Sequence, residues 1–180
     1  MSELERVANE LQKRHPGFKI VKKRDSPLMK TVNVLLMIIT FGRMRSFMSD
    51  YVTTIGKTVY VTEHWDSNPA LVNAATLRHE GVHIAQAERE GMVFYALKYL
   101  FWLLPAGLSR SRRDYEMEAY EESIRAHVEY FGIEFVEREE YKSRMISQFT
   151  SSSYMWMWPF KKSIESWFNK IIVDVKNKSA

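Results

Sequence analysis

The sequence contains no cysteine, and this absence excludes several classes of protein. Without thiols there is no disulfide framework of the kind that stabilises small secreted domains, and no cysteine-ligated zinc finger. The absence fits a reducing compartment. Residues 1–5 are acidic and polar, unlike the basic and apolar start of a signal peptide, so we expect a cytoplasmic location.

Long uninterrupted hydrophobic runs are also missing. Residues 32–41 form one short apolar run, and residues 92–108 form a second that Lys98 and Pro105 interrupt. Both fall short of the roughly 20 apolar residues that a membrane-spanning helix needs. We interpret both runs as buried helices. The alternative for residues 92–104 is peripheral contact with a membrane surface.

The chain also lacks a strong excess of positive or negative charge. The 26 basic and 22 acidic residues give a net charge of +4, and the basic residues are spread along the chain. This mild bias is typical of a solvated surface, and we expect no nucleic-acid partner. The apolar fraction of 46% and the length of 180 residues are those of an ordinary globular protein. They predict a single domain over residues 1–180.

Residues 76–83 contain the motif His-Glu-x-x-His within a helical pattern that we expect to end near Glu90. Residues four apart on an α-helix lie about 40° apart around its axis. His79 and His83 therefore point the same way and could hold one metal ion through two imidazole nitrogens. Glu80 lies about 100° round from His79, where its carboxylate can take a proton from a bound water. Zinc is the metal that best suits such ligands.

Chance does not readily produce this motif. With 5 His and 17 Glu in 180 residues, the expected number of matches, 180 × (5/180)² × (17/180), is roughly 0.01. The alternative interpretation is a pair of ordinary surface histidines. We favour the metal site, because the match also lies in a helical segment, as the chemistry requires.

A catalytic zinc site needs a third protein ligand. The nearby histidine of the metzincin pattern is absent, because the two positions that would carry its glycine and histidine hold Gln86 and Arg89. A glutamate from a later helix is the alternative, and residues 113–120 supply Glu116 and Glu118. These two lie about 200° apart around a helix, so only one can face the ion.

Glu116 is the better candidate for the third ligand. Its neighbours on the same helix face are Ala119 and Tyr120, and the small Ala119 permits close helix packing. Glu118 would instead bring Glu121 and Glu122 against the site, and this crowding of negative charge raises the cost of burying it.

The two motifs together, His79 to His83 followed by Glu116-x-x-Ala119, resemble the gluzincin metallopeptidases. The short chain and the strand-rich residues 51–61 are similar to the minimal single-domain members, the minigluzincins, and the resemblance covers residues 51–120. It implies a zinc-dependent metallopeptidase, with Zn²⁺ held by His79, His83 and Glu116. A zinc-bound water activated by Glu80 would hydrolyse peptide bonds of a peptide or protein substrate.

The resemblance also implies a fold. It would be α+β, mainly helical and zincin-like, with the active-site helix against a small β-hairpin or sheet and extra N- and C-terminal helices. In this family a strand beside the zinc helix borders the cleft, and an extended substrate can pair with such an edge. The strand containing Tyr60 and Val61 is the candidate here.

One position departs from the family pattern. The residue four after the ligand glutamate is often Asp, which holds a zinc histidine, and here it is Tyr120. Tyr120 is therefore a candidate to hydrogen-bond a zinc ligand or to stabilise the oxyanion, for which Tyr60 and His127 are further candidates. The competing hypothesis is a catalytically silent zinc-binding module for structure or interaction, in a larger assembly or at a membrane surface. Glu80 argues against it, because a structural zinc site needs no base.

Local patterns predict the remaining elements. They are, in chain order, a helix capped by Ser2 and Glu5, a strand at 18–22, a helix from Ser26, a hairpin of 51–54 and 57–62, and a helix at about 114–130. The apolar stripe of residues 160–175 predicts a helix packed on the core, with membrane contact as the alternative. The aromatic cluster at 154–158 is interpreted as core packing, with a partner or membrane contact as the alternative. Gly81 in the active-site helix would permit close approach of a neighbour or of substrate.

Overall fold

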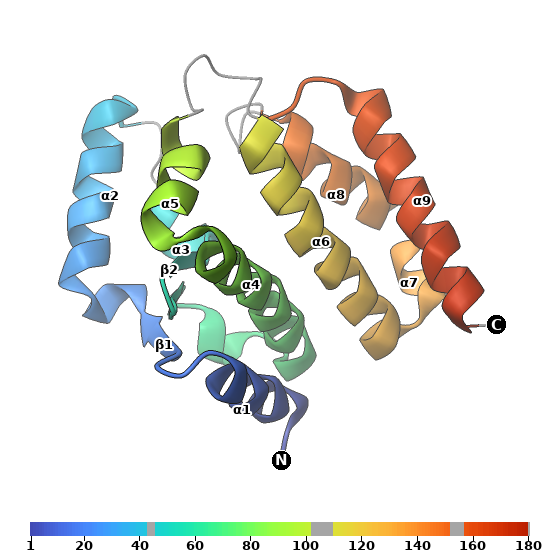
Figure 1. Ribbon diagram of the computed structural model, residues 1–180, viewed down its shortest axis with the longest axis horizontal. Helices are drawn as coiled ribbons and strands as arrows, with labels where there is room; N and C mark the ends of the chain where they lie inside the picture. The colour runs from blue at the N-terminus through green and yellow to red at the C-terminus, as the bar shows by residue number, and fades with distance from the viewer. Residues whose placement is uncertain (43–45, 102–109, 152–156, 180) are drawn as a thin grey trace. The chain divides into compact units, whose positions relative to one another are not determined.

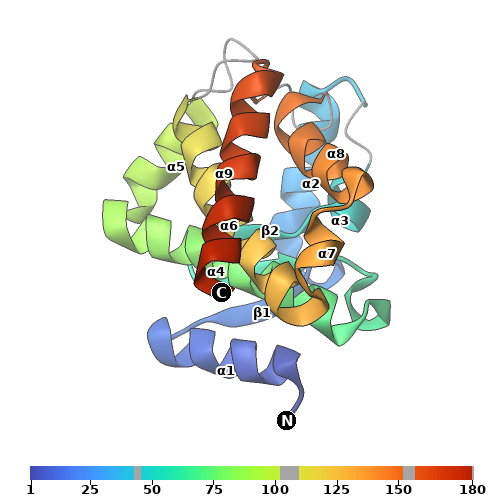
Figure 2. The same ribbon diagram turned by 90° about the vertical axis from the view of Figure 1, so that its right-hand side faces the viewer.

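The computed structural model describes residues 1–42, 46–101, 110–151 and 157–179 (Figures 1 and 2). Over these residues the fold is α+β and mostly helical with a small three-stranded sheet, which confirms the predicted class. Internal contacts divide the chain into two compact units, Met1–Ile84 and Ala85–Ala180. The boundary lies inside helix α4 (Ala70–Glu90), which continues through it. The single domain over residues 1–180 stays a prediction.

The first unit begins with the predicted capped helix. The hydroxyl of Ser2 accepts a hydrogen bond from the Glu5 N–H, and the Glu5 carboxylate accepts one from the Ser2 N–H. This helix is α1 (Glu3–Arg14). The elements that follow it in the first unit are β1 (Lys19–Lys22), η1 (Lys23–Asp25), α2 (Pro27–Ile39), α3 (Phe47–Asp50), β2 (Thr53–Ile55), β3 (Thr58–Val61), η2 (Trp65–Ser67) and most of α4.

The sheet has the strand order β1-β3-β2. The central strand β3 pairs parallel with β1 and antiparallel with β2, so β2 and β3 form the predicted hairpin. Gly56 at the turn has a φ of +61°, which a residue with a side chain rarely adopts. Val59 and Val61 are fully buried. Because β3 is central, the expectation that it offers an edge to substrate is wrong, and β2 is the edge strand of the hairpin.

Helix α2 does not have the predicted buried position. The spacing predicts a helix from Ser26, and Ser26 indeed caps it by accepting a hydrogen bond from the Met29 N–H. Met29 is fully buried, but the side chains of Ile38 and Ile39 are 66% and 70% exposed. The interpretation of residues 32–41 as a buried helix is therefore wrong for its outward side.

The second unit contains the end of α4, followed by α5 (Met92–Phe101), α6 (Arg110–Phe131), α7 (Ile133–Val136), α8 (Glu139–Thr150) and α9 (Lys161–Ser179). Helices α6, α7, α8 and α9 pack on one another, as Figure 2 shows. The apolar stripe of α9 supplies the buried residues Ile164, Phe168, Ile171, Ile172 and Val175. This confirms the predicted packing of the last helix on the core.

The apolar helix α5 differs from α9. Its described side chains Met92, Val93, Phe94 and Leu97 are exposed, so the prediction that this run is buried is wrong for them. Residues 102–108 of the run lie outside the described residues. In the part of the chain that the structure describes, no helix has both the length and the apolar character needed to cross a membrane.

The aromatic cluster at 154–158 is described in part. Met157 and Trp158 are buried and pack in a cluster with Ile146, Phe149 and Ile164, as the core interpretation predicts. Residues 154–156 lie outside the described residues.

Candidate metal centre

Helix α4 carries His79, Glu80 and His83. The buried Asn73 side chain donates a hydrogen bond of 2.7 Å to the Trp65 carbonyl and ties the first turns of α4 to η2. Leu77, two residues before the motif, and Ile84, directly after it, have no exposed surface. The motif is therefore held on a helix whose inner face is anchored on both sides of it.

Gly81 lets helix α1 approach α4 on the side of the helix opposite the two histidines. A Cβ atom at this position would lie 2.6 Å from Leu11 Cδ2, closer than real Cβ contacts allow. The close approach expected at Gly81 is thus confirmed, and its neighbour is α1. Glycine inside a helix costs up to about 1 kcal/mol relative to alanine, and here a larger residue would force Leu11 to shift.

The two imidazole rings converge through their Nε2 atoms, which lie 3.2 Å apart. The ring planes are inclined at 78°. A tetrahedral ion with metal–nitrogen bonds of about 2.0–2.1 Å would separate two such nitrogens by about 3.3–3.4 Å. The spacing of the two nitrogens therefore fits a shared ion, as the four-residue separation on the helix predicts.

Helix α6 is held against the last turns of α4 by polar contacts in the second unit. The buried Gln86 side chain donates to the Tyr115 carbonyl and to the Glu118 carboxylate, both at 3.0 Å. Arg89 pairs with the same Glu118 carboxylate at 3.2 Å. The Glu118 carboxylate thus binds Gln86 and Arg89 near the C-terminal end of α4. Tyr115 directly precedes the third candidate ligand, Glu116.

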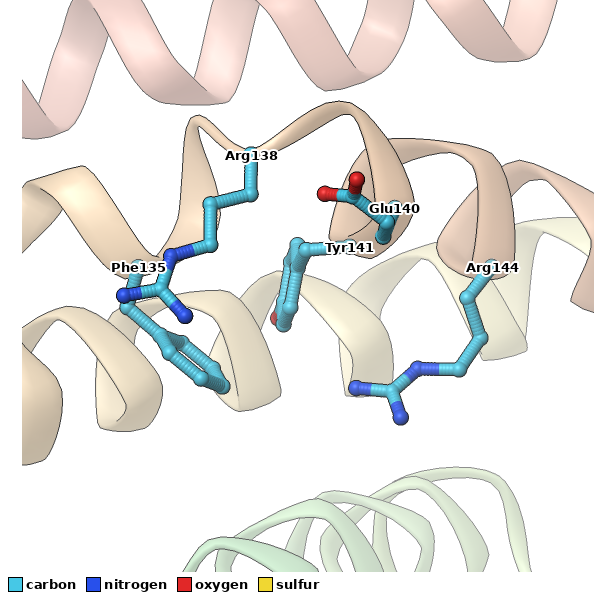
Figure 3. Close-up of a pocket in the computed structure, with 5 residues that line it drawn as sticks. All are labelled: Phe135, Arg138, Glu140, Tyr141 and Arg144. Carbon is cyan, nitrogen blue, oxygen red and sulfur yellow. The ribbon is translucent and has the colours of Figure 1, made fainter.

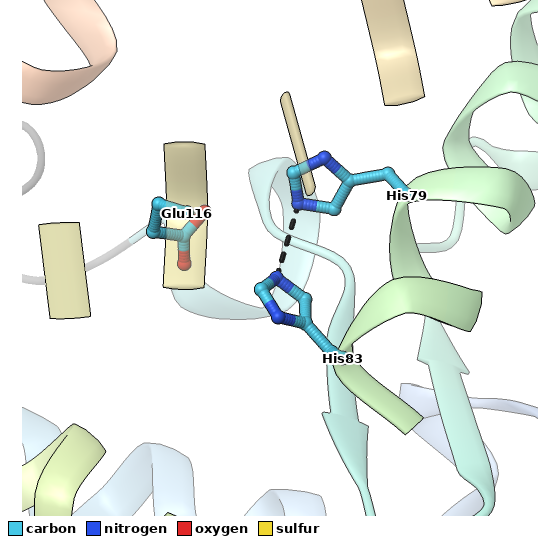
Figure 4. Close-up of side chains that lie close together, drawn as sticks. All are labelled: His79, His83 and Glu116. Carbon is cyan, nitrogen blue, oxygen red and sulfur yellow. Dashed lines mark hydrogen bonds between the residues drawn. The ribbon is translucent and has the colours of Figure 1, made fainter. Parts of the chain in front are cut away.

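Glu116 rather than Glu118 belongs to the candidate metal group. One ligand atom from each of His79, His83 and Glu116 lies within 4.8 Å of the others (Figure 4). Glu116 is only 3% exposed, whereas Glu118 is exposed. These residues form a group that could bind a metal ion.

Glu80 is buried beside this group and is oriented by the sheet. The Thr54 hydroxyl, on edge strand β2, donates a hydrogen bond of 2.6 Å to Glu80 Oε2. This bond restrains one of the two carboxylate oxygens. Glu80 is not among the three atoms that converge, as expected for a base beside an ion.

A buried lysine lies in the same unit. Lys23 is 1% exposed, its Nζ donates to the Phe47 carbonyl at 2.7 Å, and it lies 3.6 Å from the centre of the Phe47 ring. Burial lowers the pKa of Lys23 to about 8, and the charge of Glu80 acts in the opposite direction. Lys23 therefore contributes to the electrostatic environment of Glu80.

Sequence reasoning missed both Thr54 and Lys23. Thr54 hydrogen-bonds Glu80 and the charge of Lys23 interacts with that of Glu80, both from segments distant in the chain, and neither residue belongs to a motif. The alternation of the hairpin places Thr54 on a strand but does not reveal which side chain meets α4. Lys23 stands in a basic run that is typical of a solvated surface, so no local signal indicates its burial.

The other predicted donors have different surroundings. The ring of Tyr120 packs 5.3 Å from that of Phe149, between the two core clusters of the second unit. His127 lies eleven residues beyond Glu116 on α6, or roughly 16 Å along the helix. Its Nδ1 is 2.8 Å from the Tyr141 hydroxyl. Tyr60 is half-buried on the central strand β3. His127 is not part of the convergent group, and the roles of Tyr120 and Tyr60 stay predictions.

A pocket of about 370 Å³ lies elsewhere in the second unit (Figure 3). It is lined by Phe135, Arg138, Glu140, Tyr141 and Arg144. None of these residues belongs to the candidate metal group. The hollow in Figure 3 is therefore a feature of α7 and α8, and we do not assign the metal chemistry to it.

Comparison of the chain with known proteins identifies no relative. No protein-family model, no curated protein and no solved structure matches the chain. The candidate site is therefore assigned from its own residues: two histidines with converging nitrogens, a buried glutamate that could join them around an ion, and a second buried glutamate beside them.

Proposed function

We propose that the chain is a zinc-dependent metallopeptidase of the gluzincin type with a zincin-like fold. His79, His83 and Glu116 would hold the ion, and Glu80 would act as the general base. The observation that carries the proposal is the 3.2 Å convergence of the two Nε2 atoms next to the buried Glu116. Two imidazoles and one carboxylate are a ligand set that catalytic zinc uses.

The ion would supply Lewis-acid chemistry: when bound, it would lower the pKa of a water molecule and polarise the peptide carbonyl. Glu80 accepts a proton from the attacking water and returns it to the leaving amine. The Thr54 hydroxyl holds Glu80 Oε2, so the other carboxylate oxygen is the one that takes up the proton. A base fixed in this way needs little reorganisation during the reaction.

The sheet supports an extended peptide as substrate. In the strand order β1-β3-β2, strand β2 lies at the end of the sheet and pairs with β3 along one of its two edges. A peptide could add to the other edge of β2 through backbone hydrogen bonds. Since Thr54 of β2 contacts Glu80, a peptide on this edge would lie close to the proposed base.

The proposal is tested by metal analysis combined with cleavage of a broad peptide library. The purified protein should contain about one zinc ion per chain and should cleave peptides. Glu80→Gln should retain the ion and the fold and lose about 10²–10⁴-fold in turnover, because glutamine cannot accept the proton. Glu118→Gln, a matched change of an exposed carboxylate, should retain activity. Peptide cleavage by Glu80→Gln at the wild-type rate would disprove the role of Glu80.

The competing function is a silent metal-binding module. Bound zinc without cleavage of any library peptide, in both the wild type and Glu80→Gln, would favour it. The buried position of Glu80 and its bond from Thr54 support the enzyme instead. A structural site would not require a carboxylate held beside the ligands.

A further inference from the structure

The outward side of helix α2 is a continuous apolar stripe. The exposed residues Leu28, Thr31, Val34, Leu35, Ile38 and Ile39 recur at helical spacing, and Phe41, directly after the helix, is 94% exposed. Successive residues of a helix turn by about 100°, so these positions lie on one side of α2. The buried Met29 and the half-buried Asn33, Leu36 and Met37 face the other way. We call the outward set the α2 stripe.

The polar atoms of α2 near this stripe are satisfied within the helix. The Thr31 hydroxyl donates to the Pro27 carbonyl at 3.1 Å, and the Thr40 hydroxyl donates to the Leu36 carbonyl at 2.7 Å. Thr31 therefore presents its methyl group to the outside. A large exposed surface without polar groups is typical of a binding surface.

Charge indicates which partner fits the stripe. Residues 1–84, the unit that contains α2, hold 12 Lys and Arg against 8 Asp and Glu, a net charge of +4. Residues 85–180 hold 14 of each, so the whole net charge of the chain lies in the first unit. Lys30 is exposed at the border of the α2 stripe. An apolar helix face in a cationic unit complements an anionic surface with an apolar interior.

We propose that the α2 stripe binds the surface of an anionic lipid bilayer. The helix has 13 residues and a length of about 20 Å, which is less than the about 30 Å of a bilayer core. It would therefore lie in the interface, with Ile38, Ile39 and Phe41 among the acyl chains and Lys30 among the headgroups. A second copy of the chain is the less favourable occupant, because two such units would bring like charges together.

The test is flotation of the full-length protein with vesicles of phosphatidylglycerol and phosphatidylcholine, compared with vesicles of phosphatidylcholine alone. The wild type should bind the anionic vesicles at least about tenfold more tightly, and added salt should weaken the binding. The double variant Ile38→Ser/Phe41→Ser should lose at least about tenfold in binding to the anionic vesicles. Val173→Ser, which changes a valine of α9 that is 55% exposed, should bind like the wild type.

Several outcomes would overturn the proposal. The proposal is wrong if the wild type does not bind anionic vesicles, or if the folded double variant binds them as tightly as the wild type. Loss of binding in Phe94→Ser but not in the α2 variant would assign the contact to α5. A dimer in sedimentation equilibrium that the double variant dissociates, without vesicle binding, would assign the stripe to a second copy. Ile39→Lys provides a second variant if the double variant fails to fold.

Discussion

Two histidine sites in this protein show what separates a candidate ligand from a structural residue. His79 and His83 turn two ring nitrogens toward each other at 3.2 Å, with the buried carboxylate of Glu116 nearby. His127 instead places its Nδ1 2.8 Å from the Tyr141 hydroxyl and packs its ring on Phe131 and Phe135.

The difference lies in the chemistry of the neighbours rather than in burial. Around His127 the neighbours are aromatic rings, a phenol and the positive charge of Arg144, and desolvation lowers its pKa to about 4. Such surroundings favour the neutral ring and offer no second ligand for a cation. Around His79 and His83 the neighbours are another imidazole and a carboxylate, which together attract a cation.

The largest expected effect is the loss of bound zinc when His79 or His83 is replaced, and no loss when His127 is replaced. His79→Ala or His83→Ala should reduce bound zinc from about one per chain to near zero, because one imidazole of the shared pair is removed. His127→Asn should leave the zinc content unchanged. Metal analysis after dialysis measures both. Full zinc occupancy in the double variant His79→Ala/His83→Ala would remove the contrast between the two histidine sites.

The next effect distinguishes the two glutamates of α6. Glu116→Ala should weaken zinc binding and eliminate activity, since it removes the buried carboxylate of the group. Glu118→Ala should retain both and cost about 1 kcal/mol of stability, because its pair with Arg89 is exposed and Gln86 keeps its hydrogen bond to the Tyr115 carbonyl. Zinc titration of the two proteins gives the comparison. If Glu118→Ala loses the ion and Glu116→Ala keeps it, Glu118 is the ligand.

Acid should lower the stability of the folded protein by protonating His127 in the unfolded chain. Its pKa is about 4 in the folded protein against 6.5 as the ordinary value, so the unfolded chain binds the proton more readily. The stability contributed by neutral His127 is complete above pH 6.5 and is lost as the pH falls toward 4, on the order of 3 kcal/mol in total. Urea unfolding with excess chelator, which removes effects of metal release, should show this loss. His127→Asn should flatten that part of the profile, and an unchanged profile would contradict the assignment.

The smallest expected effect concerns the partner of His127. Tyr141→Phe removes the hydroxyl within 2.8 Å of Nδ1 and leaves a buried ring nitrogen without this partner. We expect a loss of about 1–2 kcal/mol in the free energy of unfolding. Zinc content should not change. A loss of zinc in Tyr141→Phe would mean that the two histidine sites are coupled.

Local sequence patterns predicted those parts of the fold that depend on near neighbours. The capping box of Ser2 and Glu5, the hairpin turn at Gly56 and the stripe of α9 all involve residues close in the chain. In α9, charged residues mark the outer face, so the apolar face could be assigned to the core. The convergence of His79 and His83 follows from helix geometry for the same reason.

Helix α2 shows where such prediction fails. From Val34 to Ile39 its residues are apolar on all sides, so no polar face indicated which side is outward. The sequence therefore suggested complete burial, and the structure buries one side only. Thr54 and Lys23 were missed for a related reason, because their interactions with Glu80 depend on how distant segments meet.

The contact of Leu11 with Gly81 links the ion to the first helix of the chain. The Leu11 side chain packs against α4 at Gly81, two residues from each histidine and about 200° round the helix from both. Linkage requires that any coupling between the two events be reciprocal: if docking of α1 strengthens metal affinity, the metal protects α1 from local opening by the same free energy. Hydrogen exchange of the α1 amides, with and without zinc, would then report occupancy of a site to which α1 contributes no ligand.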